Sequence, residues 1–295
     1  MTLTQSAPRE DAIPMGRAAS PAPSSKGLRR TPFRRLLSPG RGVQLARVAL
    51  LVAVLGLWQL LSDLGVLDRL IFSDPVDVLT TLAKMLAGEQ IERAVIYPHI
   101  WTTVSEMAIG YAVGSTVSVL VGIALARSRT VGQVVEPFIL AWYGIPIITI
   151  APLLVLVFGI GFGSKAATAY LGTFFAVFFQ TYSGVMSLKE EYFLLARLMG
   201  ASQLDLMRRV LIPGSLPFIF VGLRQAVPVA MTGAIVGEFV ASSAGLGAFI
   251  LNASASFDPA AAFAGLLIVI AVVTTFGQVV RWAEGLAIRW RPTAR

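Results

Sequence analysis

The sequence has no cysteine and a single histidine among its 295 residues. Without cysteine, the chain has no disulfide framework, no thiolate metal site and no cysteine nucleophile. His99 has no second histidine or cysteine to complete a metal site, so we interpret it as a residue at a membrane interface. Nucleophiles, bases and metal ligands do not cluster along the sequence, which argues against an enzyme and predicts no cofactor.

A phosphate-binding loop is missing as well. No segment has the form G-x-x-x-x-G-K-[ST], so we expect any ATP hydrolysis to take place on another chain. The glycines of Ser243–Gly247 follow an apolar segment rather than a strand, which is not the context of a phosphate loop. They indicate a compact extracellular turn instead.

Charged residues are scarce. They make up 14% of the chain against 56% hydrophobic residues, and the mean hydropathy is +0.75. These values are far from those of a soluble domain. A net charge of +8 would by itself suit a nucleic-acid partner, but with this apolar content it indicates basic loops at an anionic membrane face. The composition therefore predicts a membrane protein in contact with lipids and no nucleic acid.

Six apolar segments come close to the roughly 20 residues that a bilayer requires. They predict an all-α, polytopic membrane protein of about six transmembrane helices, with a permease domain over 45–290. The six segments are Leu45–Leu61, Trp101–Ala126, Val134–Phe158, Ala166–Leu188, Leu216–Val240 and Ala260–Val280. Residues 1–44 are rich in Pro, Ser, Ala and Arg, and this composition predicts a disordered, basic cytoplasmic tail. Ser73-Asp74-Pro75 indicates the start of a short amphipathic helix on the outer surface.

The basic residues predict the orientation, because cytoplasmic loops carry an excess of lysine and arginine. Nineteen of the 24 fall in the N-terminal tail, the second and fourth inter-span loops and the C-terminus. The opposite side has only Arg69, Lys84, Arg93 and Lys165. We therefore expect both termini to be cytoplasmic.

The segment Ser187–Pro217 is the most charged stretch between two apolar segments, and it contains signals for two short helices. Ser187 with Glu190 and Ser202 with Asp205 have capping-box spacing. Gly200 stands between the two helices, where a residue with positive φ can end the first one. Pro213 and Pro217 are predicted to prevent simple continuation into the next span. We expect two helices hinged at Gly200.

This segment, ARLMGAS…RRVLIPGSLP, resembles the cytoplasmic "EAA" loop of bacterial ABC-importer permeases. Ala196, Gly200 and Pro213 match that pattern, whereas Leu194 and Leu195 replace its Glu and first Ala. HIWTTVSEMAIGYAVG, GIPIITIAPLLVLVFGIGFGSK and GAIVGEFVASSAGLGAFILNASASFD extend the resemblance to the nitrate/sulfonate/taurine branch, over about His99 to Val280. The resemblance implies a type I ABC-importer permease fold. It also implies a coupling loop over 189–213 that docks into the ATPase, with coupling residues Ala196, Gly200, Ala201, Asp205, Arg208 and Pro213.

The same resemblance implies a multi-pass protein of the bacterial plasma (inner) membrane. Its partners would be cytoplasmic ATPase subunits, an extracytoplasmic solute-binding protein and a second permease copy, most simply as a homodimer. The solute would be of the nitrate, sulfonate or taurine type. A pyrimidine vitamin precursor or another small organic solute is the alternative. A secondary transporter is an alternative of another class, but such a protein is expected to show paired half-repeats, and we find no convincing inverted repeat.

Three ionisable residues fall within predicted spans: Glu106, Arg224 and Glu238. Charge at this depth is costly and faces either a water path or a polar partner inside the bundle. The three residues are therefore candidates for the translocation path or gate, and interhelical hydrogen bonding is an equally supported interpretation. Acids at an entry would suit a cationic or neutral solute better than nitrate.

Overall fold

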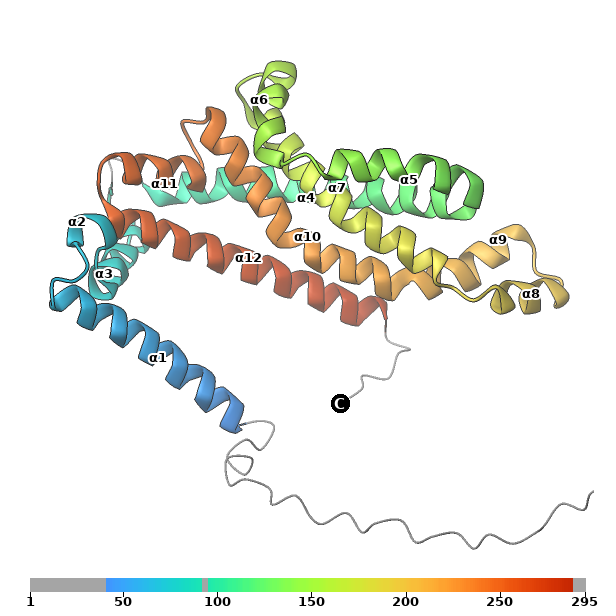
Figure 1. Ribbon diagram of the computed structural model, residues 1–295, viewed down its shortest axis with the longest axis horizontal. Helices are drawn as coiled ribbons and strands as arrows, with labels where there is room; N and C mark the ends of the chain where they lie inside the picture. The colour runs from blue at the N-terminus through green and yellow to red at the C-terminus, as the bar shows by residue number, and fades with distance from the viewer. Residues whose placement is uncertain (1–40, 92–94, 289–295) are drawn as a thin grey trace, which may run out of the picture. The chain divides into compact units, whose positions relative to one another are not determined.

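The computed structural model describes residues 41–91 and 95–288, and this part of the chain is helical without β-strands. The chain divides into two units, 1–53 and 54–295, and the boundary falls within the first helix. The helices are α1 (Arg41–Asp63), α2 (Arg69–Phe72), α3 (Pro75–Leu86), α4 (Ile96–Arg127), α5 (Arg129–Tyr143), α6 (Ile147–Phe158), α7 (Phe162–Met186), α8 (Glu190–Leu198), α9 (Gln203–Leu206), α10 (Ile212–Ala241), α11 (Leu246–Ala255) and α12 (Pro259–Ala287) (Figure 1).

The predicted tail lies mostly outside the described residues, which begin at position 41. The first described helix, α1, begins at Arg41.

Four helical segments of the described chain are long and apolar enough to cross a membrane: Gly42–Asp63, Ile96–Arg127, Gln203–Ala241 and Pro259–Ala287. The count rises to six if two bent helix pairs each form one span. One pair is α5 with α6, which meet at 93°, so the predicted span Val134–Phe158 is broken rather than continuous. The break falls at Gly144–Pro146, where the residue before proline disfavours helical geometry. The other pair is α7 with α8, bent by 58°.

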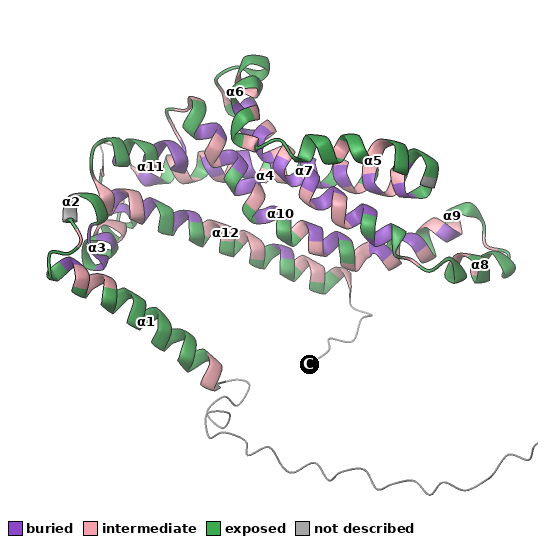
Figure 2. Cartoon of the chain, in the orientation of Figure 1, coloured by how far each residue is buried: buried purple, intermediate pink, exposed green. Residues whose placement is uncertain are grey.

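Helices α4, α7 and α10 form the most closely packed part of the second unit, and buried residues line all three (Figure 2). Gly110 and Gly114 of α4 lie directly against α7: a Cβ at Gly110 would come within 2.6 Å of the Ala166 carbonyl oxygen. Small residues at such a spacing allow two helix backbones to approach. The G-x-x-x-G pair thus serves packing within this chain.

The predicted amphipathic helix after Ser73-Asp74-Pro75 is confirmed as α3. Asp74 is its N-cap, and its carboxylate accepts the N–H of Asp77 at 2.8 Å. Pro75 occupies the first helical turn, where a missing N–H costs no intrahelical bond. Val78 and Met85 bury one face of α3, which packs against α12.

Candidate functional site

The loop between α7 and α10 contains the hinge that the sequence predicts. Gly200 has φ +82°, and the chain around it closes a Schellman motif at the end of α8. The N–H of Ala201 donates to the Ala196 carbonyl at 3.0 Å, and the N–H of Gly200 donates to the Arg197 carbonyl at 2.9 Å. A Cβ at Gly200 would meet no atom within 4 Å, so the backbone angle alone favours glycine here.

The predicted capping box of Ser187 with Glu190 is wrong. Helix α8 begins after Lys189, which makes no side-chain cap. Ser187 is instead the C-cap residue of α7, directly after Met186. Its hydroxyl donates to the Gly184 carbonyl at 2.8 Å. The hydroxyl therefore stabilises the helix before it rather than the helix after it.

The second box, Ser202 with Asp205, is confirmed. The N–H of Asp205 donates to the Ser202 hydroxyl, and the N–H of Ser202 donates to the Asp205 carboxylate, both at 3.2 Å. Asp205 also pairs with Arg209 at 3.3 Å, on the surface, where water and salt weaken such a pair.

The prediction that Pro213 and Pro217 prevent a continuous helix from the loop into the next span is wrong. A π-helical turn, Met207–Leu211, joins α9 to α10, and the N–H of Ile212 donates to the Met207 carbonyl. Pro213 stands in the first turn of α10, where proline is tolerated. The result is one helical segment from Gln203 to Ala241.

The remaining coupling-loop candidates lie around this junction. Ala196 and Pro213 line the same open cavity of about 440 Å³, together with Met199. Arg208 is exposed on the π-helical turn, and Ala201 directly follows the hinge. The structure thus brings Ala196 and Pro213 together, 17 positions apart in sequence, on one side of the loop.

Glu238 caps α11 from another helix. Its carboxylate accepts the N–H of Gly247 at 2.5 Å, and Ala248 also donates a backbone hydrogen bond to it. The hydroxyl of Thr103, on α4, donates to Glu238 at 2.5 Å and accepts the N–H of Leu246 at 2.7 Å. The first N–H groups of a helix have no partner within the helix, so α4 and α10 supply the partners that α11 lacks.

The glycines before α11 make room for this carboxylate. A Cβ on Gly245 would overlap the Glu238 carboxylate, and one on Gly247 would lie 2.7 Å from its Oε2. Gly245 also has φ +113°, which side chains rarely adopt. The sequence alone predicts that these glycines form a compact turn. The structure adds a second reason for glycine at positions 245 and 247, which is the space needed by the Glu238 carboxylate.

His99 lies at the same cap. Its Nδ1 is 3.1 Å from the nitrogen and 2.9 Å from the oxygen of Gly245, and its ring packs edge-on against Phe249. In the described chain, His99 is part of the α11 cap and no group of metal-ligating residues surrounds it.

Glu106 and Lys165 complete the buried cluster. Glu106 is 2% exposed and Glu238 is 1% exposed, and their side chains share a hydrogen bond. The charge of Lys165, itself buried at the start of α7, acts on Glu106. The Oε2 atom of Glu106 has no hydrogen-bond partner among the described residues. The sequence places Lys165 in an outer loop and gives no signal for its burial.

Arg224 lies apart from this cluster. It pairs with Glu284 of α12 at 3.0 Å, and 40% of its side chain remains exposed. The three intramembrane candidates are therefore not one group: two lie together at the α11 cap, and one joins α10 to α12.

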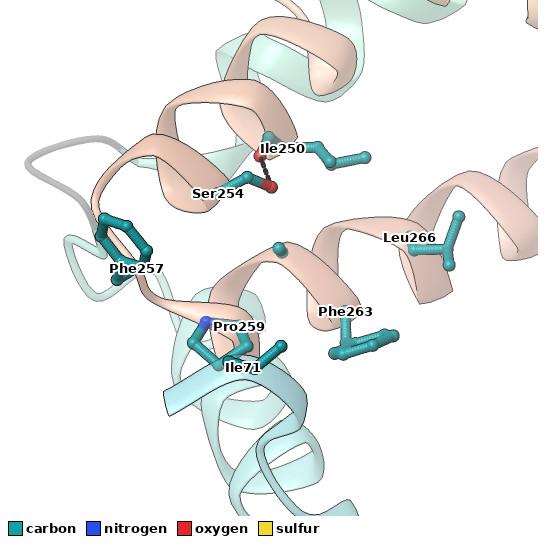
Figure 3. Close-up of a pocket in the computed structure, with 8 residues that line it drawn as sticks. Ile71, Ile250, Ser254, Phe257, Pro259, Phe263 and Leu266 are labelled. Carbon is teal, nitrogen blue, oxygen red and sulfur yellow. Dashed lines mark hydrogen bonds between the residues drawn. The ribbon is translucent and has the colours of Figure 1, made fainter. Parts of the chain in front are cut away.

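An apolar cavity of about 420 Å³ lies where α11 and α12 meet (Figure 3). Phe257, Phe263 and Leu266 are among its lining residues, and none of the lining residues is charged. The hydroxyl of Ser254 donates to the Ile250 carbonyl at 2.8 Å, as the dashed line shows. The lining of this cavity is therefore mainly apolar, which suits a polar solute poorly.

Long apolar helices, with a buried polar cluster at one end and the Gly200 loop at the other, are the architecture of a polytopic membrane protein. The chain belongs to the family of binding-protein-dependent transport system inner membrane components, whose model matches residues 114–288. It is an ABC-importer permease of the branch that includes sulfonate permeases.

Two relatives agree with this assignment, and a solved structure shares the fold. The chain is 26% identical to the aliphatic sulfonates transport permease protein SsuC of Bacillus subtilis, over 92% of this chain and 95% of SsuC. It is 32% identical to the formylaminopyrimidine transport permease protein ThiX of Halalkalibacterium halodurans, over 68% and 80%. The inward-facing MetNI methionine ABC transporter has a similar fold, with a TM-score of 0.53 at 17% identity, covering 65% of this chain and 93% of the other.

Proposed function

We propose that this permease carries a small polar solute across the bacterial plasma membrane and that residues 189–213 couple it to an ATPase. The observation that carries the proposal is the continuous helical segment from Gln203 to Ala241. Its first turn is capped by Ser202 and lies directly beyond the Gly200 hinge. A displacement of α9 by a docked ATPase is therefore transmitted along α10 without passing a flexible joint.

The loop has a surface suited to that docking. Leu195, Leu198 and Met199 are 60%, 77% and 81% exposed at the end of α8. Adjacent exposed apolar side chains at the polar end of a membrane protein mark a protein contact, because water solvates them poorly. The basic-residue pattern supports a cytoplasmic position for this surface.

The docking surface makes a testable prediction. Replacing both Leu198 and Met199 with glutamate is expected to reduce the amount of ATPase that co-purifies with the permease by about tenfold or more, as for loss of apolar anchors at an interface. Phe257→Ser is the matched control. Phe257 is 77% exposed, as the docking residues are, but it lies in the turn between α11 and α12 and not in the loop between α7 and α10. Equal ATPase recovery from the double variant and the control would contradict docking on α8.

We propose the nitrate, sulfonate or taurine type as the main solute class, supported by the similarity to a sulfonate permease over nearly the whole chain. A pyrimidine precursor is the second candidate, supported by the 32% identity to a formylaminopyrimidine permease. The enclosed positions of Glu106 and Glu238 favour a role in holding α11 over direct contact with either solute.

The assembly follows from the same proposal. Two copies of this chain, two cytoplasmic ATPase subunits and an extracytoplasmic binding protein would form the importer, with both permease termini in the cytoplasm. Dependence of uptake on ATP tests this assembly, and uptake without ATP would contradict it.

A further inference from the structure

A third cavity, of about 380 Å³, lies beside α8 and shares no lining residue with the docking surface. The ends of α4 and α7 form one wall, with Ile123, Val185 and Met186. Helix α8 and the π-helical turn form the other wall, where Phe193 and Leu211 are among the lining residues. The cavity therefore lies where two membrane helices end and the coupling loop begins.

Two arginines line this cavity, beside the apolar side chains, Glu190 and Gln203. Arg127 is in the last turn of α4, and Arg197 is in the last turn of α8. Neither forms an ion pair within the described residues. Glu190 is the one acidic residue of the lining, so the charged side chains there leave one net positive charge.

We propose that this cavity binds an anionic phospholipid of the cytoplasmic leaflet, with its phosphate between Arg127 and Arg197 and the start of an acyl chain against Ile123 and Met186. Basic pockets between membrane helices on the cytoplasmic side suit anionic head groups, because the guanidinium groups match phosphate oxygens. The apolar wall belongs to the spans themselves, which favours a lipid over a soluble anion. A protein occupant fits less well, because Leu195 and Met199 of the docking surface line the cavity beside Ala196 and Pro213 rather than this one.

The bound lipid would join the membrane to the loop. Arg197 belongs to α8, three residues before the Gly200 hinge, whereas Arg127 belongs to α4. A phosphate held by both arginines would fix α8 relative to the spans and keep the docking surface in place for the ATPase. This inference rests on the proposed cytoplasmic orientation of the loop.

The test is native mass spectrometry of the purified complex in mixed phosphatidylglycerol and phosphatidylcholine. The wild type is expected to retain phosphatidylglycerol selectively. The double variant Arg127→Gln, Arg197→Gln is expected to retain at least about tenfold less, since each basic residue near an anionic surface contributes about fivefold. Glu190→Gln should retain more, because it removes the acidic residue of the lining.

Matched controls separate this site from general charge. Lys189→Gln with Arg208→Gln removes the same charge from the same loop but outside the lining, and should leave retention unchanged. Arg127→Lys with Arg197→Lys keeps the charge and should restore most retention, which shows that a loss in the glutamine variant is not misfolding.

Three outcomes would overturn the inference. They are equal phosphatidylglycerol retention by the wild type and the glutamine variant, displacement of the lipid by inorganic phosphate, and retention that requires the ATPase. The last two would assign the cavity to a free anion or to a protein contact. The lipid measurement does not depend on transport. If the proposed coupling to the ATPase is wrong, that failure is seen in the ATPase co-purification experiment and not in lipid retention.

Discussion

Glu238→Ala is expected to abolish transport and to lower the melting temperature of the permease more than any other single change considered for the α11 cap. The variant removes the acceptor of the buried N–H groups of Gly247 and Ala248, whereas the Thr103 hydroxyl keeps the His99 carbonyl as an acceptor. Each unsatisfied buried group costs about 1–3 kcal/mol, and a cavity adds to that cost. Thermal unfolding in detergent and solute uptake in vesicles measure the two effects.

Two further variants separate a structural role from contact with solute. Glu284→Gln removes a more exposed acid on α12 and is expected to change the melting temperature little. Glu238→Gln keeps the shape and one acceptor oxygen. If the glutamine variant is as stable as the wild type but transports differently, Glu238 acts on the solute or the gate rather than on α11.

Gly200→Val is expected to leave the permease in the membrane at wild-type levels but to reduce ATP-driven transport strongly. Valine at φ +82° is strained by about 1–3 kcal/mol, although no neighbouring atom obstructs its side chain. Relief of that strain breaks the Schellman motif and changes the angle between α8 and α9. Transport, ATPase activity and ATPase recovery are measured on the same preparation.

Gly200→Asn is the control for that experiment, because asparagine tolerates the left-handed region better than other residues with a side chain. It is expected to retain most transport. Full transport by the valine variant would show that the hinge does not couple hydrolysis to import. Loss of membrane insertion in both variants would show that Gly200 serves folding instead.

Local signals in the sequence predicted local structure well. The positive φ of Gly200, the Ser202–Asp205 box and the start of α3 at Asp74 each depend on neighbours within a few residues, and all three are confirmed. Ser187 shows the limit of such signals. Its hydroxyl has two partners within reach, and the sequence does not say that it bonds backwards to Gly184.

The cap on α11 could not be predicted from spacing. Thr103 and Glu238 are 135 positions apart, and their contact exists only because α4 and α10 pack side by side. The burial of Lys165 beside Glu106 has the same origin. The sequence does contain one signal for this cap, which is the carboxylate of Glu238 within a predicted span, followed by Gly245 and Gly247. The first N–H groups of a helix need acceptors, and glycine leaves room for a carboxylate to approach them.

ATP-driven import is tested most directly by solute uptake into proteoliposomes containing the permease, its ATPase and its binding protein, with ATP either inside or absent. Uptake is expected only with internal ATP, with the binding protein outside and with an intact Gly200 hinge. A panel of sulfonates, taurine, nitrate and pyrimidines identifies the solute in the same assay. Uptake by the permease alone, driven by an ion gradient without ATP, would show that this chain does not work as part of an ATP-driven importer.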